Sequence, residues 1–303
     1  MYDVVALGEA LIDFSLLEAD GEGYPAMQAH PGGAPANFLA AVNRCGGKTA
    51  MLAKVGDDVF GRLLINTMKR VHIDTAGILL SKDFFTTLAF VTLDEKGDRD
   101  FSFARKPGAD TRLRFEELDL GLIDEAKAFH FGTLSLTDEP ARTATEKAVA
   151  YAKEKGKLIT CDPNLRKPLW SDLETAKEQM RWAVSRADVV KISDEEGEFL
   201  FGCGPEAAAE TLIEACGVKT AFVTCGSSGA VFAGPKGRGS VKAPAVHPVD
   251  TTGAGDIFGG TAVYHILHAG KEPEDLTAAE LEAITEKACT AASLSTERPG
   301  GLW

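Results

Sequence analysis

The stretch Val249-Asp250-Thr251-Thr252-Gly253-Ala254-Gly255-Asp256-Ile257-Phe258-Gly259-Gly260 is a polar, glycine-rich turn that runs directly into an apolar helix predicted over Ile257–Leu267. Successive small residues leave backbone N–H groups open, and these amides, with the positive end of the helix dipole, favour a phosphate or a developing negative charge. Asp256 lies at the start of this helix, where aspartate is also a common N-cap. The turn alone leaves an anion cradle and an ordinary helix cap equally open.

Outside this turn, short apolar, β-branched runs alternate with longer segments of helical periodicity. This alternation predicts an α/β fold with a largely parallel sheet covered by helices. The predicted strands are Val4–Leu7, Ala50–Val55, Ala128–Phe131, Lys157–Cys161, Asp188–Ile192 and Ala221–Thr224. The predicted helices are Pro35–Cys45, Val59–Val71, Pro140–Lys155, Leu173–Ser185, Glu206–Cys216, Gly255–Ala269 and Ala278–Ser295.

Two stretches, 12–33 and 84–107, interrupt the alternation. In the second, Leu88–Leu93 and Arg99–Phe103 flank the turn sequence 94–98 in the manner of a β-hairpin. A small β insertion is therefore expected. Because no Ser/Pro-rich linker and no internal repeat divides the chain, we expect residues 1–303 to form a single domain that carries this insertion.

The composition and net charge limit the classes of partner that this chain is expected to bind. Apolar residues make up 45% of the 303 residues, which is enough for a large core, and the net charge is −13. A nucleic-acid backbone or an anionic membrane would be repelled on average, so neither is an expected partner. A small anionic ligand remains open, because a pocket depends on local dipoles and on one or two cations.

The six cysteines contain no CxxC pair and no zinc-like spacing, so they are predicted to be reduced core thiols. The stretch Asp3–Leu7 follows Met1 and Tyr2 without a basic region, and no later run reaches the ~18 apolar residues of a membrane span. The expected location is the cytoplasm.

Two common nucleotide motifs do not fit. Gly47-Lys48-Thr49 resembles the end of a Walker A loop, but the first glycine of that motif would fall at Val42, inside a predicted helix. The stretch Gly8–Asp13 has one glycine and lacks the G-x-G-x-x-G pattern of dinucleotide-binding folds. A nicotinamide-dependent dehydrogenase is therefore disfavoured.

A second glycine-rich entry to a helix, Pro31-Gly32-Gly33-Ala34-Pro35-Ala36-Asn37, permits close approach of a ligand to the backbone, or forms an ordinary turn with a proline in the first helical turn. Together with the first motif, in this order, it resembles the signatures of the ribokinase-like (PfkB) carbohydrate kinases, most closely the fructokinases. The similarity extends over nearly the whole chain, through Gly8–Asp13, Pro31–Asn37, Val55–Gly61, Asp162–Arg166, Thr224–Gly226 and Asp250–Asp256.

The resemblance implies a doubly wound, mostly parallel sheet flanked by helices, with a small β lid formed from about 12–33 and 84–107. In related enzymes the lid often forms a dimer interface, so a homodimer is an expected partner arrangement. The implied reaction is transfer of the γ-phosphoryl group of ATP to a sugar hydroxyl. Asp256 matches the catalytic base, and Gly253, Ala254 and Gly255 match the anion hole. We expect the helix dipole to lower the pKa of Asp256, so that this residue orients the hydroxyl and accepts its proton late.

Other site residues also come from the resemblance. Positions that bind the sugar are matched by Asp13, Gly32, Gly33, Asn37 and the lid arginine Arg105. Positions that bind the nucleotide are matched by Asn164, Arg166, Glu196, Thr224, Gly226, Ala288, Ala291 and Ser295.

Two metal ions are implied as well. Mg²⁺ is expected near Glu196 through water, although Ser193 stands where the family usually has asparagine. Asp250, Thr252 and Gly300 resemble positions that hold a monovalent cation, which suggests activation by K⁺. An acidic helix start is the alternative interpretation of the segment before Glu196, and packing within a helix is the alternative for the predicted adenine-pocket positions in 278–295.

The first functional hypothesis is a fructokinase that converts ATP and D-fructose to ADP and fructose 6-phosphate with Mg²⁺. Within the same class, the acceptor could instead be 2-keto-3-deoxygluconate, ribose, another hexose or a nucleoside. Two other classes stay open: a catalytically inactive kinase-like scaffold, and a small-molecule binding protein that uses the cleft without nucleotide. Asp256, the glycines before it and Glu196 argue against an inactive scaffold, which needs none of them.

Overall fold

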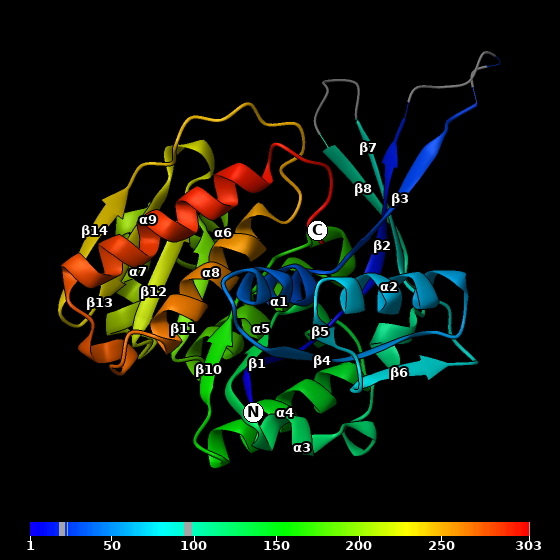
Figure 1. The fold of residues 1–303 in the computed structure, drawn as a ribbon, viewed down its shortest axis with the longest axis horizontal. Helices are drawn as coiled ribbons and strands as arrows, with labels where there is room; N and C mark the ends of the chain where they lie inside the picture. Colours follow the sequence, from blue (N-terminus) through cyan, green and yellow to red (C-terminus); the bar gives the residue numbers. More distant parts are fainter. Residues whose placement is uncertain (18–21, 23, 94–98, 303) are drawn as a thin grey trace.

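A ten-stranded sheet forms the centre of the computed structural model, which describes residues 1–17, 22, 24–93 and 99–302 (Figure 1). Its strands are β1 (Tyr2–Leu7), β4 (Thr49–Gly56), β5 (Ile73–Asp74), β6 (Ile78–Ser81), β9 (Ala126–Phe131), β10 (Leu158–Cys161), β11 (Val189–Ser193), β12 (Thr220–Thr224), β13 (Ala230–Gly234) and β14 (Gly237–Val241). The order is β14-β13-β12-β11-β10-β9-β1-β4-β5, and β6 also pairs with β4. All pairs are parallel except those of the edge hairpin β13–β14 and its junction with β12.

Helices cover both faces of this sheet. On one face lie α1 (Ala34–Arg44), α2 (Val59–Arg70), α8 (Ala254–Leu267) and α9 (Ala278–Ser295). On the other face lie α3 (Leu120–Asp124), α4 (Ala141–Glu154), α5 (Leu173–Arg186), α6 (Asp194–Phe201) and α7 (Pro205–Glu214). Within the described residues, no helix combines the length and the apolar character that are required to cross a bilayer.

The central strand β1 shows why the strand sequences are continuously apolar. Val4 and Ala6 pack into the core beneath α1 and α8, whereas Val5 and Leu7 pack into the core beneath α4 and α5, and all four are fully buried. Because side chains alternate between the two faces of a strand, a sheet covered on both faces requires apolar residues at every position. The doubly wound architecture follows from this pattern.

A second, four-stranded sheet projects beyond the main sheet and forms the β lid (Figure 1). It contains β2 (Leu11–Leu16), β3 (Met27–Gly32), β7 (Leu88–Leu93) and β8 (Arg99–Ala104) in the order β3-β2-β7-β8. Phe14 stacks on Phe90 within the lid and meets Phe60 of α2 edge-on, with ring centroids 5.3 and 5.6 Å apart. These aromatic contacts attach the lid to the helical layer.

The six strands and seven helices predicted from the sequence are confirmed, with ends that differ by at most a few residues. The predicted pairing of the segments on either side of 94–98 is also confirmed, while the turn itself lies outside the described residues. Several short elements were not predicted: the helices α3 and α6, the strands β5 and β6, and the edge hairpin β13–β14, whose second strand is rich in glycine. All six cysteines are free thiols, but only Cys161 and Cys289 are fully buried.

Candidate active site

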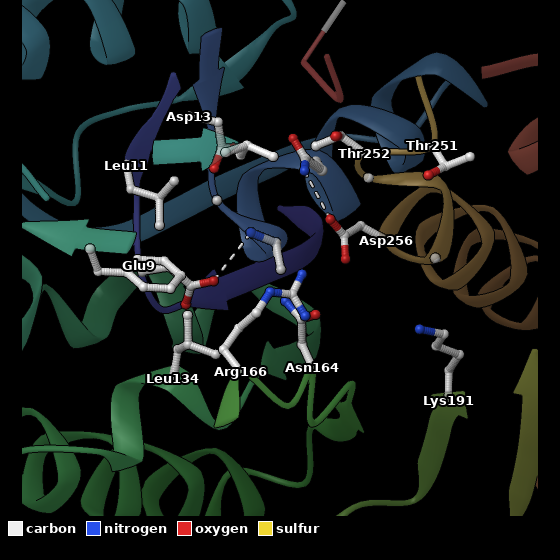
Figure 2. A pocket seen from close by; sticks show the side chains of 17 residues that line it. Glu9, Leu11, Asp13, Leu134, Asn164, Arg166, Lys191, Thr251, Thr252 and Asp256 are labelled. Carbon is white, nitrogen blue, oxygen red and sulfur yellow. Dashed lines mark hydrogen bonds between the residues drawn. The ribbon is translucent and has the colours of Figure 1, made fainter. Parts of the chain in front are cut away.

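A cavity of about 200 Å³ lies at the carboxyl ends of the central strands, under residues of β2, β7 and β8 (Figure 2). This is the edge at which open α/β sheets bind ligands. The polar residues that line it come from the loop after β1, strand β2, the start of α1, the loop after β10, strand β11, and the turn before α8 with the start of that helix. They are Glu9, Asp13, Asn37, Asn164, Arg166, Lys191, Thr251, Thr252 and Asp256, together with the backbone of Gly33, Gly253 and Gly255.

The predicted anion cradle forms the start of α8. Gly253 is the N-cap and has φ +79°, a left-handed conformation that glycine adopts without strain. Among the described residues, no side chain caps this helix, and the Ala254 amide makes a weak 3.3 Å hydrogen bond to the Thr251 carbonyl. The first turn of α8 therefore faces the cavity with backbone donors that are not capped by any side chain.

Asp256 lies in this first turn and is 9% exposed. Its Oδ2 accepts a 2.8 Å hydrogen bond from Asn37 Nδ2. Burial, together with the nearby carboxylate of Asp162, raises the pKa of Asp256 to about 7, against the opposing effects of Asn37, Lys191 and Arg166. The sequence-based expectation of a lowered pKa is wrong, because the cost of burying the charge exceeds the stabilisation from the helix dipole.

The predicted sugar-binding positions other than Arg105 meet on the lid side of the cavity. Burial raises the pKa of Asp13 to about 6, and Gly32 packs against this carboxylate, since a Cβ there would come within 2.5 Å of Asp13 Oδ2. Gly33 has φ +110°, and a Cβ there would come within 2.5 Å of the Glu9 carbonyl oxygen. The glycines thus let the chain pass close to Asp13 and Glu9 as it enters α1.

Asn164 and Arg166 follow β10 and line the cavity opposite the lid, as the position after a strand predicts. Asn164 has φ +53°. This left-handed conformation is unusual for residues other than glycine, and asparagine tolerates it better than most. One Arg166 Nη atom donates to the Leu165 carbonyl at 3.2 Å. Both side chains line the same cavity as the start of α8.

Two charged residues of the cavity were missed from the sequence. Lys191 lies on β11, and its Nζ is 3.0 Å from Asp162 Oδ2 and next to the α8 turn, since a Cβ on Gly255 would lie 2.7 Å from it. Glu9 lies after β1, and its Oε1 accepts a hydrogen bond from the Ala34 amide at 3.2 Å. A lysine within the apolar run Val189–Ser193 was the sequence signal for the first residue.

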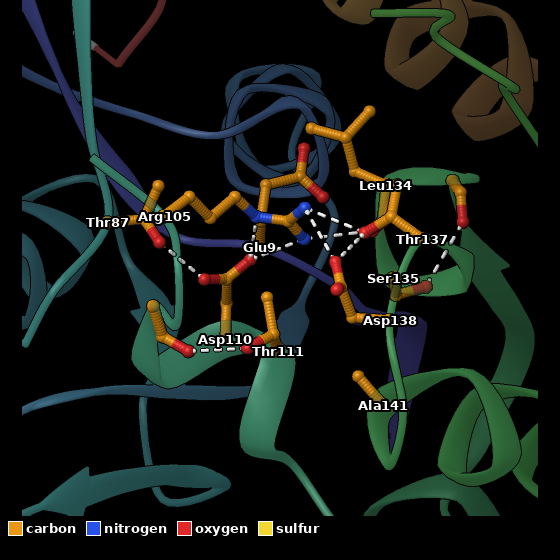
Figure 3. A network of polar contacts seen from close by, with 12 residues as sticks. Glu9, Thr87, Arg105, Asp110, Thr111, Leu134, Ser135, Thr137, Asp138 and Ala141 are labelled. Atoms are coloured by element: carbon orange, nitrogen blue, oxygen red, sulfur yellow. Dashed lines mark hydrogen bonds and ion pairs between the residues drawn. The ribbon is translucent and has the colours of Figure 1, made fainter. Parts of the chain in front are cut away.

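Arg105 does not line the cavity, in contrast to the expected approach of a lid arginine to the substrate (Figure 3). Its guanidinium forms a buried ion pair with Asp110 at 2.8 Å and donates to Thr137 Oγ1 and the Leu134 carbonyl. A buried guanidinium requires several acceptors, and these groups supply them below the cavity floor. In this structure Arg105 joins the end of β8 to the segment around Leu134.

Glu196 and Ser193 form a capping box at the start of α6. Glu196 Oε2 accepts from the Ser193 amide at 2.8 Å, and Oε1 accepts from the Leu165 amide at 2.6 Å. Burial raises the pKa of Glu196, and Asp162 raises it further. Each Glu196 oxygen therefore accepts from a backbone donor, and the first turn of α6 carries the acidic residues Asp194, Glu195 and Glu196.

The predicted adenine-pocket positions lie mainly inside the protein. Ala288 is fully buried in the core and Ser295 is 2% exposed, whereas Ala291 is half-buried on α9. Thr224 and Gly226 follow at the end of β12, where Thr224 Oγ1 donates to the Ile192 carbonyl at 3.3 Å. None of these five residues lines the central cavity.

The predicted monovalent-cation residues come together. Asp250 Oδ1 accepts from the amide and hydroxyl of Thr252 at 2.9 and 2.7 Å, and its Oδ2 accepts from the Gly300 amide at 2.9 Å. This carboxylate joins the α8 turn to the C-terminal segment. Across the described residues, no group of three or more His, Cys, Asp or Glu side chains is arranged to hold a metal ion.

An uncapped helix start, a buried carboxylate beside it and further carboxylate and amide groups under a β lid match a phosphotransferase of the ribokinase-like α/β class. Comparison with known proteins agrees. The chain belongs to the pfkB family of carbohydrate kinases, whose family model matches residues 1–302.

Relatives with assigned names include fructokinase-2 of Solanum lycopersicum, 42% identical over 308 residues that cover 99% of this chain and 92% of that protein. A probable fructokinase-2 of Arabidopsis thaliana is 44% identical over 273 residues, covering 87% of this chain and 81% of the relative. Among solved structures, the fructokinase of Xylella fastidiosa with bound ATP superposes with a TM-score of 0.90 at 28% identity, covering 100% of this chain and 94% of its own. A double-mutant fructokinase of Vibrio cholerae O395 in a form with fructose, ADP and potassium ion superposes with a TM-score of 0.87 at 32% identity, covering 99% and 94%.

Proposed function

We propose that this carbohydrate kinase transfers the γ-phosphoryl group of ATP to D-fructose and releases fructose 6-phosphate and ADP. One observation carries the proposal: a single cavity joins Asp13 and the Gly33 turn to the open start of α8, with Asp256 between them. The relatives named above support fructose as the acceptor, since all four are named fructokinases and one solved relative holds fructose itself.

In the proposed reaction, Asp256 accepts the proton of the attacking sugar hydroxyl as the new O–P bond forms and the bond between the γ-phosphorus and the ADP oxygen breaks. Asn37 holds Asp256 Oδ2, which leaves Oδ1 for the hydroxyl. The amides of Gly253, Ala254 and Gly255 would stabilise the charge on the transferred group. A pKa of about 7 suits this role, because the carboxylate then binds the proton readily near neutral pH.

On the acceptor side, we assign Asp13, Gly32, Gly33 and Asn37 to the sugar hydroxyls, since carboxylate and amide groups both bind polyols. Buried groups of this kind reject analogues that lack the matching hydroxyl. Arg105 is assigned an indirect role, because its guanidinium is committed to Asp110.

On the nucleotide side, we assign Asn164 and Arg166 to the phosphates of ATP, and Lys191 beside the α8 turn supplies a further buried positive charge. Thr224, Gly226, Ala288, Ala291 and Ser295 remain proposed for the region of the base. Mg²⁺ binds protein sites through one or two carboxylates, several waters and substrate phosphates. We propose that Mg²⁺ arrives with ATP and meets Glu196 through water, because both Glu196 oxygens already accept backbone hydrogen bonds.

Three further assignments stay with the proposal. Asp250, Thr252 and Gly300 would support a K⁺ ion beside the α8 turn, and equal rates in Na⁺, K⁺ and a bulky organic cation would exclude this. The lid is proposed as the interface of a homodimer, with the whole chain as one catalytic domain. The cytoplasm is the proposed location, in keeping with six free thiols.

The test is a coupled assay of ADP release with ATP and Mg²⁺ across a panel of D-fructose, other hexoses, ribose, 2-keto-3-deoxygluconate and nucleosides. We expect release that depends on fructose. Release with a different acceptor alone would refute fructose and preserve the kinase chemistry, whereas no release with any acceptor would refute the proposed activity.

A further inference from the structure

Glu9 lies beneath the first turn of α1 at the edge of the central cavity (Figure 2). It is 3% exposed, and its Oε1 accepts a hydrogen bond from the amide of Ala34, the first residue of α1. Within the described residues, Glu9 Oε2 is buried without a hydrogen-bond partner. A buried carboxylate that binds one backbone amide is costly, so helix capping alone does not account for it.

The first turn of α1 connects Glu9 to the reacting groups. The Asn37 amide donates to the Gly33 carbonyl at 3.0 Å, and Asn37 Nδ2 donates to Asp256 Oδ2 at 2.8 Å. The turn that Glu9 holds at Ala34 therefore carries the amide group that orients the proposed base. Misplacing a reacting group by about 1 Å can cost about 100-fold in rate, so the position of this turn matters to the chemistry.

Charges also connect Glu9 with Asp256. Figure 3 places Glu9 beside the guanidinium of Arg105, which favours the ionised carboxylate, whereas Asp110 and Asp256 oppose it. Burial raises the pKa of Glu9 to about 7. The other charged groups that face Asp256 are Asp162, Lys191 and Arg166.

We propose that Glu9 is a positioning residue for phosphoryl transfer: through the first turn of α1 and Asn37 it fixes the orientation of Asp256, and its negative charge strengthens Asp256 as a base. Arg105, which does not reach the cavity, acts on the site through Glu9. The kinetic part of this inference rests on the proposed kinase activity, while the electrostatic part is measurable without catalysis.

The kinetic test compares Glu9→Ala and Glu9→Gln with a control, Glu280→Ala, which removes a similar carboxylate cap from the exposed start of α9, where Glu280 Oε2 accepts from the Thr277 amide at 2.9 Å. Glu9→Ala is expected to lower kcat by roughly 10- to 100-fold with the sugar KM within about threefold. Glu9→Gln keeps an acceptor for the Ala34 amide and restores most of kcat, and the control keeps both constants. An unchanged kcat in Glu9→Ala, or a rise in KM alone, overturns the positioning role.

The electrostatic test follows the carboxyl carbon of Asp256 by NMR titration, with Asp256→Asn used to assign the signal. Removing the charge in Glu9→Gln is expected to lower the pKa of Asp256 by roughly half a unit, and to move the acid limb of the rate profile to lower pH by the same amount. An unchanged titration overturns the proposal. If Glu9→Ala does not fold, the titration and kcat of Glu9→Gln decide the proposal. If the wild type phosphorylates no acceptor, the proposed function fails, and the titration still decides the role of Glu9.

Discussion

Two helices begin at the same edge of the sheet, and they begin differently. At α6, the Ser193 hydroxyl accepts from the Glu196 amide and the Glu196 carboxylate accepts from the Ser193 amide, so the two side chains cap this helix start. At α8, the N-cap is Gly253, and among the described residues no side chain takes the corresponding place. Side chains of the capping box therefore bind backbone amides at the start of α6, whereas no side chain in the part of the chain that the structure describes caps the amides at the start of α8.

The difference shows how sequence separates a structural helix start from a binding one. A serine with a glutamate three residues later closes a helix N-terminus, whereas small residues leave its amides and its positive dipole end available to an anion. In α8 the acidic residue stands at Asp256, within the first turn rather than at the cap, and it faces the cavity. The proposed function assigns a ligand to the open start of α8 and the role of base to Asp256.

The largest effect is expected from Asp256→Asn, which keeps the shape of the open helix start and removes its base. We expect kcat to fall by about 10²–10⁴-fold, because general-base catalysis contributes on that order. The dissociation constant of the sugar should change little, since asparagine still accepts the bond from Asn37. ADP release and calorimetric sugar binding measure the two quantities, and a near-normal kcat would remove Asp256 from the mechanism.

A smaller but still large effect is expected from Gly253→Ala, which disturbs the open start itself. The new Cβ would lie 3.0 Å from Asn37 Nδ2, at a residue with φ +79°. Moving the backbone donors should lower kcat by about 10²-fold or more. The control is Gly270→Ala, which has φ +69° and open space around the new Cβ, and so carries the same backbone strain away from the site. Equal losses of kcat in the two variants would show that strain, and not the cradle, matters.

The acid limb of the rate profile tests the carboxylate of the open helix start. Burial raises the pKa of Asp256 to about 7 and that of Asp13 to about 6. Because a base must be ionised, kcat/KM should fall about tenfold per pH unit below pH 7. A profile that stays flat down to pH 5 would contradict the raised pKa values.

Stability should respond to pH in the opposite sense. The folded-state pKa of Asp256 lies above the unfolded value of about 4, so between those two values the folded protein binds a proton that the unfolded chain has released. The contribution of Asp256 to the free energy of unfolding is therefore complete below about pH 4 and is lost as the pH rises through 7. Urea unfolding from pH 4 to pH 8 measures it, and Asp256→Asn should reduce this slope.

The smallest effect is expected at the closed helix start. Ser193→Ala removes the hydroxyl that accepts from the Glu196 amide at 3.1 Å, which should cost about 1 kcal/mol of stability. The rate should change less than in Gly253→Ala, since the change lies at the helix that the protein caps itself. A loss of kcat equal to that of Gly253→Ala, with stability unchanged, would reverse the comparison between α6 and α8.

The sequence was sufficient for the fold because the central strands are short, mainly apolar runs and most of them are followed by a periodic helix. It was also sufficient for the residues carried by local motifs, such as Asp13, Asn37 and Asp256, which the structure brings to one cavity. It failed where the answer depends on distant neighbours. The partner of Arg105 is set by tertiary packing against Asp110, and the pKa of Asp256 is set by burial, which no local pattern reports.

The lid strands and α8 come from separate stretches of the chain, and the proposed function assigns them different roles. Under the proposed function, β2, β7 and β8 supply cavity walls on the acceptor side, while α8 supplies the groups assigned to the phosphoryl group. We expect that exchanging the lid strands for those of a related kinase would change the acceptor and leave the groups assigned to phosphoryl transfer in place. The fold therefore separates the strands proposed to select the acceptor from the helix proposed to act in phosphoryl transfer.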